Sequence, residues 1–238
     1  MELKTVNRKT VARYLGIKSG VLDANTDALV TRAEEMVKQD AKIEYTYKLY
    51  NLEFEDDGIC LVGTNLKLPG KGIRKLLKNS KQCIVLCATL GGQIDTKTRA
   101  LAVKEPALAI VYDAVASEFI DQVCDDIQNE VKEKLPNMKQ TWRYSAGYGD
   151  LPLELNGQIL DVVNGPKLTG IKITEGGLMS PIKSISALFG LVDTEKTAEK
   201  ESVKDLGYGP KLGCGEIEVC SECNLNATCN MSAVKQTK

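Results

Sequence analysis

A loop in the second half of the chain combines the residue types that bind a small charged ligand. Residues 143–154 read RYSAGYGDLPLE, in which Arg143 precedes two glycines, Gly147 and Gly149, that flank Tyr148. An arginine can hold a carboxylate through two parallel hydrogen bonds, and a tyrosine ring can cover a cation or a flat ring. Glycine permits positive φ angles and a close approach of backbone to ligand. The segment is therefore either a ligand-binding loop or a tight surface turn with a structural arginine.

Four cysteines gather near the end of the chain. Cys214, Cys220, Cys223 and Cys229 lie within sixteen residues. Thiolates at this density predict a metal site, either zinc held by four cysteines or an iron–sulfur cluster. The spacing matches neither usual iron–sulfur pattern well, so a tail of unliganded thiols is the alternative. The sequence favours the metal site, because a reducing compartment gives clustered cysteines little structural use.

The other four cysteines lie within apolar runs, and the chain contains no histidine. Cys60, Cys83, Cys87 and Cys124 are expected to be small buried hydrophobes, with Cys83 and Cys87 on one face of a strand. The absence of histidine excludes a His-based general acid or base, a Ser-His-Asp or Cys-His nucleophile, and an imidazole metal ligand from this chain.

Charge and hydropathy narrow the class of partner. The 238 residues include 31 Lys and Arg against 32 Asp and Glu, for a net charge of −1. This balance argues against nucleic acid, which requires a basic excess. No apolar run approaches the ~20 residues of a membrane span, and the N-terminus lacks the apolar stretch of a signal peptide. We expect a soluble, cytoplasmic protein that contacts neither nucleic acid nor membrane.

Two strong patterns predict the centre of the fold. Residues 82–90 are continuously apolar, which is typical of a strand buried on both faces. Residues 107–135 repeat apolar side chains at helical spacing until Pro136 ends the pattern. The acidic residues of this helix, among them Asp125, are expected on its solvated face. Trp142 is interpreted as a core anchor, with a stacking wall for a ligand as the alternative.

Weaker patterns predict the surrounding elements. Residues 1–40 look helical, with Asn25 or Thr26 as the N-cap of the second helix. Residues 43–54 alternate as a strand, and residues 59–62, 169–174 and 184–192 are expected to form three more. Short helices are expected at 73–79 and 153–163. Helices and strands mix without strict alternation, which favours an α+β fold with a mixed or antiparallel central sheet and flanking helices.

The loop at residues 143–154 resembles the signature of the activation domain of cobalamin-dependent methionine synthase. The fused enzyme carries Arg-x-x-x-Gly-Tyr-x-x-x-Pro-Glu-His, and free-standing family members usually read Arg-Phe-Ser-Pro-Gly-Tyr-Gly-Asp-x-Pro-Leu-Glu. In this chain Ala146 replaces the proline, and Glu154 aligns with the final histidine.

A second block strengthens this resemblance. Residues 169–187, TGIKITEGGLMSPIKSISA, are similar to the family's Gly-x-x-Leu-Thr-Glu-Ser-x-x-Met-x-Pro-x-x-Ser-Val-Ser/Thr-Ala. Shorter matches are RYLG at residues 13–16, ATLG at 88–91 and the Cys124-Asp125 pair. The resemblance spans about residues 8–230.

The resemblance implies a role in reactivating a methyltransferase. Members bind S-adenosylmethionine and present its methyl group while an electron reaches an oxidised Co(II) cobalamin, which restores methylcobalamin. This step depends on positioning and not on proton transfer, so no catalytic residue is expected. The chain has no corrinoid-binding motif, so the cobalamin would belong to a partner, either a corrinoid-binding protein or a methionine synthase core. An electron donor protein is a further implied partner.

The resemblance also implies the ligand-binding residues. Arg143 matches the arginine that contacts the methionyl carboxylate or its neighbourhood. Ala146, Gly147 and Tyr148 would contact the adenosyl group, and Ser145 and Gly149 complete the loop's part of the set. Glu175 would complement the sulfonium or amino group, or brace its loop.

A rival hypothesis is a protein with the same fold that does not bind S-adenosylmethionine. The chain would then be a non-enzymatic corrinoid-protein partner, or an electron-transfer adaptor that works through its C-terminal cysteines. Both hypotheses share the same expected boundaries: an α+β domain at residues 1–192, a charged linker or exposed helix at 193–207, and a cysteine-rich tail at 208–238.

Overall fold

The computed structural model describes residues 1–193, which form an antiparallel sheet with helices on both faces. Eight strands are present in this part of the chain: β1 (Glu44–Glu55), β2 (Gly58–Leu61), β3 (Lys67–Leu68), β4 (Gln82–Thr89), β5 (Met138–Gln140), β6 (Lys172–Ile173), β7 (Met179–Ser180) and β8 (Ser184–Asp193). Six of them pair in the order β3-β2-β1-β4-β8-β5, every pair antiparallel, while β6 and β7 form a separate hairpin. The expected α+β class and its antiparallel sheet are confirmed.

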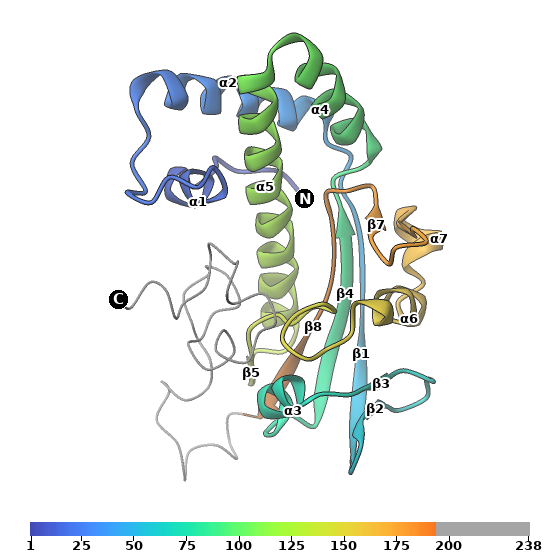
Figure 1. Ribbon diagram of the computed structural model, residues 1–238. Helices are drawn as coiled ribbons and strands as arrows, with labels where there is room; N and C mark the ends of the chain where they lie inside the picture. The colour runs from blue at the N-terminus through green and yellow to red at the C-terminus, as the bar shows by residue number, and fades with distance from the viewer. Residues whose placement is uncertain (194–238) are drawn as a thin grey trace.

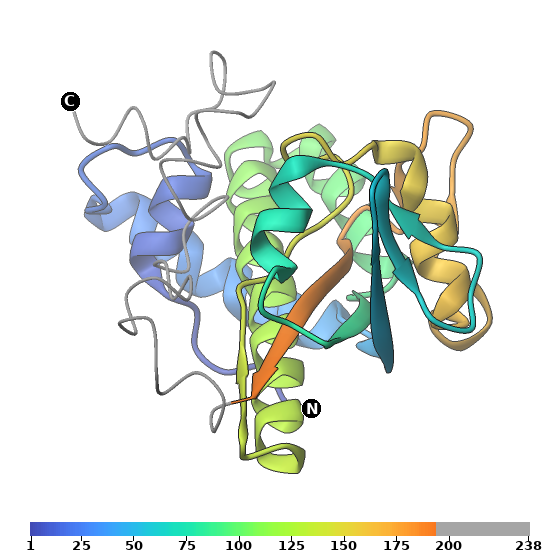
Figure 2. The ribbon, with the colours of Figure 1, turned by 90° about the horizontal axis from the view of Figure 1, so that it is seen from below.

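The helices fall into two groups around this sheet. The helical elements are α1 (Arg8–Tyr14), α2 (Ala24–Asp40), α3 (Lys71–Leu77), α4 (Gly92–Lys104), α5 (Pro106–Lys134), a 3₁₀ turn (Leu153–Leu155), α6 (Asn156–Val162) and α7 (Gly165–Thr169). Figure 1 shows α5 running along one face of the sheet, with α1, α2 and α4 gathered around its N-terminal half. Seen from below, the sheet separates α5 from α6 and α7 (Figure 2).

Strand β4 lies at the centre because its side chains are apolar on both faces. It pairs with β1 on one side and β8 on the other, so that Leu86 lies opposite Tyr47 and Ala187. Ile84, Leu86 and Ala88 join the core beneath α5, whereas Cys83, Val85 and Cys87 join the core beneath α3, α6 and α7. The expected strand with two buried faces is confirmed, and it divides the interior into two hydrophobic cores.

Three of the four described cysteines are buried, as expected. Cys83, Cys87 and Cys124 have no exposed surface, whereas Cys60 on β2 is half-buried. Burial raises the pKa of the thiols to about 12 for Cys83 and Cys124, and to about 11 for Cys87. These thiols therefore remain protonated at neutral pH and pack as small apolar side chains.

The expected elements differ from the observed ones mainly where the elements are short. Strand β5 and helix α7 have three and five residues, too few to show a period in the sequence. The N-cap of α2 is Asp23 instead of Asn25 or Thr26, because the Asp23 carboxylate accepts hydrogen bonds from the backbone N–H groups of both those residues.

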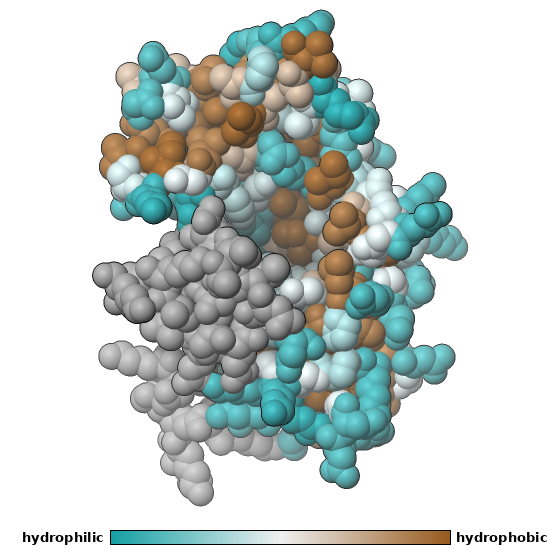
Figure 3. All heavy atoms as spheres, viewed as in Figure 1, coloured by the Kyte–Doolittle hydropathy of each residue, from teal (hydrophilic) through white to brown (hydrophobic). Residues whose placement is uncertain are grey.

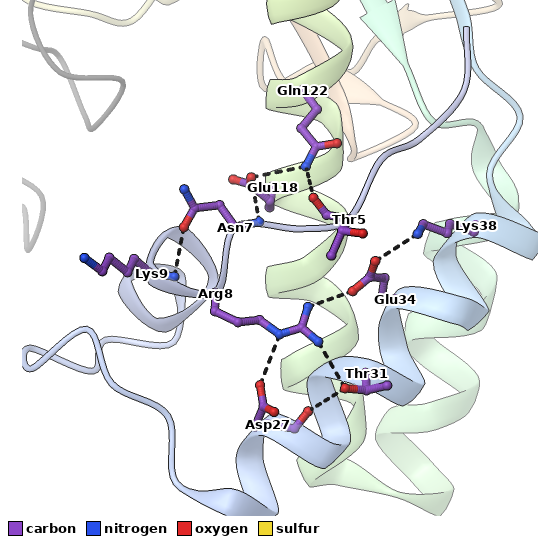
Figure 4. Close-up of polar contacts among 10 residues, drawn as sticks. All are labelled: Thr5, Asn7, Arg8, Lys9, Asp27, Thr31, Glu34, Lys38, Glu118 and Gln122. Atoms are coloured by element: carbon purple, nitrogen blue, oxygen red, sulfur yellow. Dashed lines mark hydrogen bonds and ion pairs between the residues drawn. The ribbon is translucent and has the colours of Figure 1, made fainter.

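A polar network fastens the N-terminal segment to α2 and α5 (Figure 4). The Arg8 guanidinium donates to the carboxylates of Glu34, at 2.7 Å, and Asp27, at 3.1 Å. Lys38 donates to the other oxygen of Glu34 at 2.8 Å. The backbone N–H of Asn7 donates to Glu118 on α5 at 3.2 Å. The network therefore fixes the start of α1 against the two longest helices.

No helix among residues 1–193 combines the length and apolarity needed to cross a membrane. The expected tail at 208–238 and all of the expected linker at 193–207 except Asp193, which ends β8, lie outside the described residues, and the boundary at residue 192 stays a prediction.

Candidate functional site

The loop at residues 143–150 is pinned to the central sheet by its first tyrosine. The backbone of Tyr144 exchanges two hydrogen bonds of 2.8 Å with Leu188 on β8. The Tyr144 side chain is completely buried and contacts the rings of Trp142, at 5.1 Å between centroids, and Tyr148, at 6.0 Å. Trp142 packs against the same core, as expected. The loop therefore has a rigid base beneath its exposed tip.

The glycines around this loop are explained by the Tyr144 phenol. A Cβ atom at Gly72 would lie 2.6 Å from Tyr144 Oη, and one at Gly149, whose φ is +53°, would overlap the same atom. Gly147 has a φ of +86°, and its Cβ would lie 3.1 Å from Leu153. Gly147 and Gly149 are thus required by backbone conformation and packing before any ligand is considered.

Asp150, the residue after Gly149, connects this loop to helix α3. Its carboxylate accepts hydrogen bonds from the backbone N–H groups of Lys71, at 2.5 Å, and Gly72, at 3.2 Å. These are N–H groups that the first turn of a helix leaves without intrahelical partners. The glycine-rich segment at residues 69–72 therefore accommodates Asp150 and Tyr144.

Arg143 is anchored to α5 in the described structure. Its Nη1 donates to Asp125 Oδ1 at 2.7 Å and to Gln128 Oε1 at 2.6 Å, while Nη2 lies 3.9 Å from Asp121 Oδ1. The side chain is 21% exposed. Asp125 is 27% exposed, so it is only partly solvated. The sequence placed Asp125 on the outer face of the helix but could not show that the loop returns to cover it.

Two other segments meet the same side of α5. Asp113, Ser117, Asp121 and Asp125 follow at intervals of four residues, which places them on successive turns of one helix face. We call these four residues the α5 polar stripe. Arg143 binds its C-terminal end, Tyr14 its middle and Lys183 its N-terminal end.

Lys183 and Tyr14 hold the N-terminal end and the middle of this stripe. Lys183 Nζ lies 2.8 Å from Asp113 Oδ1 and donates to Ser117 Oγ at 2.9 Å, and its side chain is only 11% exposed. Tyr14 Oη donates to Asp121 Oδ2 through a short hydrogen bond. Burial and the charge of Asp121 raise the pKa of Tyr14, so the phenol stays protonated and donates. Burial likewise raises the pKa of Asp121, while the Tyr14 hydrogen bond and the Arg143 charge oppose this rise.

The stripe therefore joins three segments that lie far apart in the sequence. Tyr14 belongs to RYLG at residues 13–16, Arg143 to the 143–154 block and Lys183 to the 169–187 block. Sequence reasoning did not single out Asp113, Ser117 or Asp121. Their regular spacing within a largely apolar helix was the available signal, but spacing alone does not reveal which segments meet that face.

The turn that contains Glu175 lies next to the loop. Glu175 is exposed in the connection between β6 and β7. Leu153 would contact a Cβ at both Gly147 and Gly177, and Asn156 Nδ2 donates to the Gly177 carbonyl at 3.4 Å. The structure thus brings the two sequence blocks together through Leu153. No contact between Arg143 and Glu175 is present among residues 1–193.

The remaining loop residues differ in exposure. Ala146 is buried, Ser145 is half-buried, and Tyr148 is 39% exposed at the loop tip. Tyr14 is 37% exposed and lies close enough to Tyr148 for the two phenols to interact electrostatically. Two aromatic side chains therefore reach the surface near the middle of the stripe.

A pocket of about 340 Å³ opens beside the N-terminal half of the stripe. Small and apolar side chains of α4 and α5 line much of it, and Tyr14, Asp113 and Ser117 supply polar groups. Figure 3 shows apolar surface at the floor of a hollow in the middle of this face of the molecule. A second depression, of about 690 Å³, lies along the C-terminal half of α5 among charged side chains, and neither depression is lined by a residue of the two blocks. The first pocket fits an amphipathic ligand better.

The structure does not test the predicted cysteine metal site. Cys214, Cys220, Cys223 and Cys229 lie outside the described residues. Within residues 1–193, no group of three or more Cys, Asp or Glu side chains has the arrangement of a metal site.

The architecture resembles that of a known domain. A crystal structure of the MetH reactivation domain bound to AdoHcy matches this fold with a TM-score of 0.62 at 14% sequence identity, over 85% of this chain and 79% of that chain. No protein-family model and no curated protein matches the sequence. The comparison therefore establishes a reactivation-domain-like fold.

Proposed function

We propose that this protein binds S-adenosylmethionine beside the α5 polar stripe and reactivates a cobalamin-dependent methyltransferase of the methionine synthase type. The main support is the convergence of three segments, around Tyr14, Arg143 and Lys183, on one face of α5. This convergence occurs in a fold that matches a reactivation domain bound to AdoHcy. The two blocks that resemble the activation-domain family supply two of the three segments.

The loop has the groups that an adenosyl ligand requires. Gly147 presents backbone in a conformation that side chains disfavour, and Tyr148 offers an exposed ring beside it. Ser145 and Ala146 would line the same part of the site, and Gly149 fits the loop over Tyr144. We assign the adenosyl group to this part of the loop.

The charged end of the ligand would lie toward α5. Arg143 is held by hydrogen bonds to Asp125 and Gln128. These bonds fix the loop near the expected position of the ligand's carboxylate, so the loop need not rearrange when the ligand binds. Glu175, in the adjoining turn, would attract the cationic sulfonium or amino group, or brace the turn. The site has no need of a general base, in keeping with a chain that lacks histidine.

Cobalamin enters the proposal as a substrate on a partner. One electron from a low-potential donor reduces its Co(II), and the methyl group of S-adenosylmethionine then passes to cobalt, leaving AdoHcy. The role of this chain is to hold the methyl donor in a fixed orientation, which lowers the entropic cost of the transfer. A corrinoid-binding protein or a methionine synthase core would be the partner.

A reconstituted reaction tests the proposal. The full chain is mixed with a cob(II)alamin-loaded corrinoid protein, a chemical reductant and S-adenosylmethionine, and methylcobalamin is followed by absorbance. We expect formation to require this chain, to fall at least about tenfold with Tyr148→Ala, and to be unchanged with the surface variant Arg99→Gln. Equal rates with and without the chain, or an undiminished rate with Tyr148→Ala, would contradict the proposal.

A further inference from the structure

Arg13, on the last turn of α1, has buried hydrogen-bond donors without acceptors. Its Nε and Nη1 atoms are inaccessible to solvent, and neither has a hydrogen-bond partner within residues 1–193. A guanidinium remains charged at all physiological pH values, so these donors cannot be neutralised by losing a proton. Leaving them unsatisfied is costly. Such an arrangement is expected where an anion binds.

The contact that Arg13 does make leaves its N–H groups unused. Its guanidinium carbon lies 5.7 Å from the centre of the Tyr14 ring. This is a cation–π contact, which uses the charge and not the hydrogen atoms. Tyr14 also lines the 340 Å³ pocket, so Arg13 lies beside a residue that faces that space.

The neighbouring carboxylates are already engaged. Asp121 Oδ2 accepts from Tyr14, and its Oδ1 faces Arg143 Nη2 at 3.9 Å. Asp125 accepts from Arg143 Nη1. Arg13 is near enough to lower the pKa of Asp121, although burial is the largest influence and raises it, but no hydrogen bond joins the two side chains.

The two arginines near the site therefore differ in what they can still bind. The Nη1 atom of Arg143 donates to two side chains of α5, whereas the Nε and Nη1 atoms of Arg13 have no acceptor among residues 1–193. Arginine matches a carboxylate best when two N–H groups bind two oxygens at once. Building on the proposed function, we infer that Arg13 binds the α-carboxylate of the S-adenosyl ligand, while Arg143 positions the loop.

A pair of ligands that differ only in the carboxylate tests this assignment. S-adenosylmethionine and its decarboxylated analogue are titrated calorimetrically into the wild type, Arg13→Gln, Arg13→Lys and the surface control Arg99→Gln. We expect the wild type to prefer the carboxylated ligand by about 10–100-fold. Arg13→Gln should abolish this preference and leave affinity for the analogue unchanged, and Arg13→Lys should retain part of it. Arg143→Gln should weaken both ligands alike.

The stability of the ligand-free protein provides a second readout. Because Arg13 has unsatisfied buried donors, Arg13→Gln should leave the thermal midpoint unchanged or raise it. A purely structural arginine would instead lower it clearly. The Arg99→Gln control should not move it.

The outcomes separate the two proposals. A wild type that binds both ligands equally, or an Arg13→Gln variant that weakens both equally, overturns the assignment of Arg13 and leaves the proposed function standing. A folded wild type that binds neither ligand overturns the proposed function and this inference with it.

Discussion

At the scale of single residues, Tyr144 explains much of a sequence pattern that looks dedicated to a ligand. Its buried phenol lies where Cβ atoms at Gly72 and Gly149 would fall, and the adjacent Asp150 caps α3. Part of the RYSAGYGD segment therefore builds the loop, and part of it remains exposed for binding. Tyr148 belongs to the second group because its side chain is exposed at the tip.

Alanine substitutions at two glycines should distinguish a steric clash with Tyr144 from the ordinary effect of alanine on helix stability. Gly149→Ala is expected to lower the free energy of unfolding by about 1–3 kcal/mol, because it adds a Cβ at positive φ against Tyr144. Gly157→Ala, in α6 with no heavy atom within 4 Å of the new Cβ, should be neutral or stabilise by about 0.5–1 kcal/mol. Urea denaturation measures both. Equal effects at the two positions would contradict the packing account.

The Arg143–Asp125 pair should be coupled in stability. Each of Arg143→Gln and Asp125→Asn is expected to cost about 1–3 kcal/mol, a value reduced for the partial exposure of both side chains. The double variant should cost less than the sum of the single changes, because one change already breaks the contact. A double-mutant cycle from chemical denaturation checks this, and strict additivity would show that the pair is not formed in solution.

At the scale of elements, α5 organises both the core and the site. One side of this helix is buried beneath the sheet, and the α5 polar stripe receives Tyr14, Arg143 and Lys183 from three other segments. The network of Figure 4 extends this role to the N-terminus by holding α1 against α2 and α5. Tyr14 and Arg13 depend on that attachment for their positions.

The ion pairs of Glu34 should make this attachment pH-dependent. Burial alone would raise the pKa of Glu34, but hydrogen bonds from Lys38 and Arg8 hold it below its usual range. Because the folded-state pKa lies below that of the unfolded chain, Glu34 stabilises the fold above the unfolded-state pKa and loses this effect as the pH falls through the folded-state pKa.

Glu34→Gln is therefore expected to lower the free energy of unfolding by about 1–3 kcal/mol at pH 7, with the difference from wild type shrinking below about pH 4.5. Denaturation curves between pH 3 and pH 8 measure this. The exposed neighbour provides the control, since Glu35→Gln should differ little from wild type at any pH. A constant difference for Glu34→Gln across the range would contradict the account.

At the scale of the whole molecule, β4 and α5 could be predicted from the sequence. The short elements and the contacts between distant segments could not. The apolar run at residues 82–90 indicated a strand with two buried faces, and the stripe at 107–135 indicated one long helix, because burial leaves a clear hydrophobic pattern in both. Strand β5, helix α7 and the α5 polar stripe escaped prediction for a shared reason. Short elements have no period, and acidic residues on a helix look solvated until another segment is known to cover them.

The burial of three of the four described cysteines should be visible in the reactivity of their thiols. Burial raises the pKa of Cys83, Cys87 and Cys124 to about 12, 11 and 12, whereas Cys60 on β2 is half-buried. We expect iodoacetamide at pH 8 to modify Cys60 in the native protein, and the other three only at the rate of unfolding. Peptide mass spectrometry of a time course checks this order, and fast labelling of Cys124 would contradict the buried position given to it.

The central claim is that an S-adenosyl ligand binds between the 143–150 loop and α5. The most direct test is a calorimetric titration of the full chain with AdoHcy, the ligand bound to the matching reactivation domain. The account predicts saturable binding with one site per chain, weakened about tenfold or more by Tyr148→Ala. A folded wild-type protein that takes up no AdoHcy at millimolar concentration, or a Tyr148→Ala variant that binds as well as wild type, would contradict it.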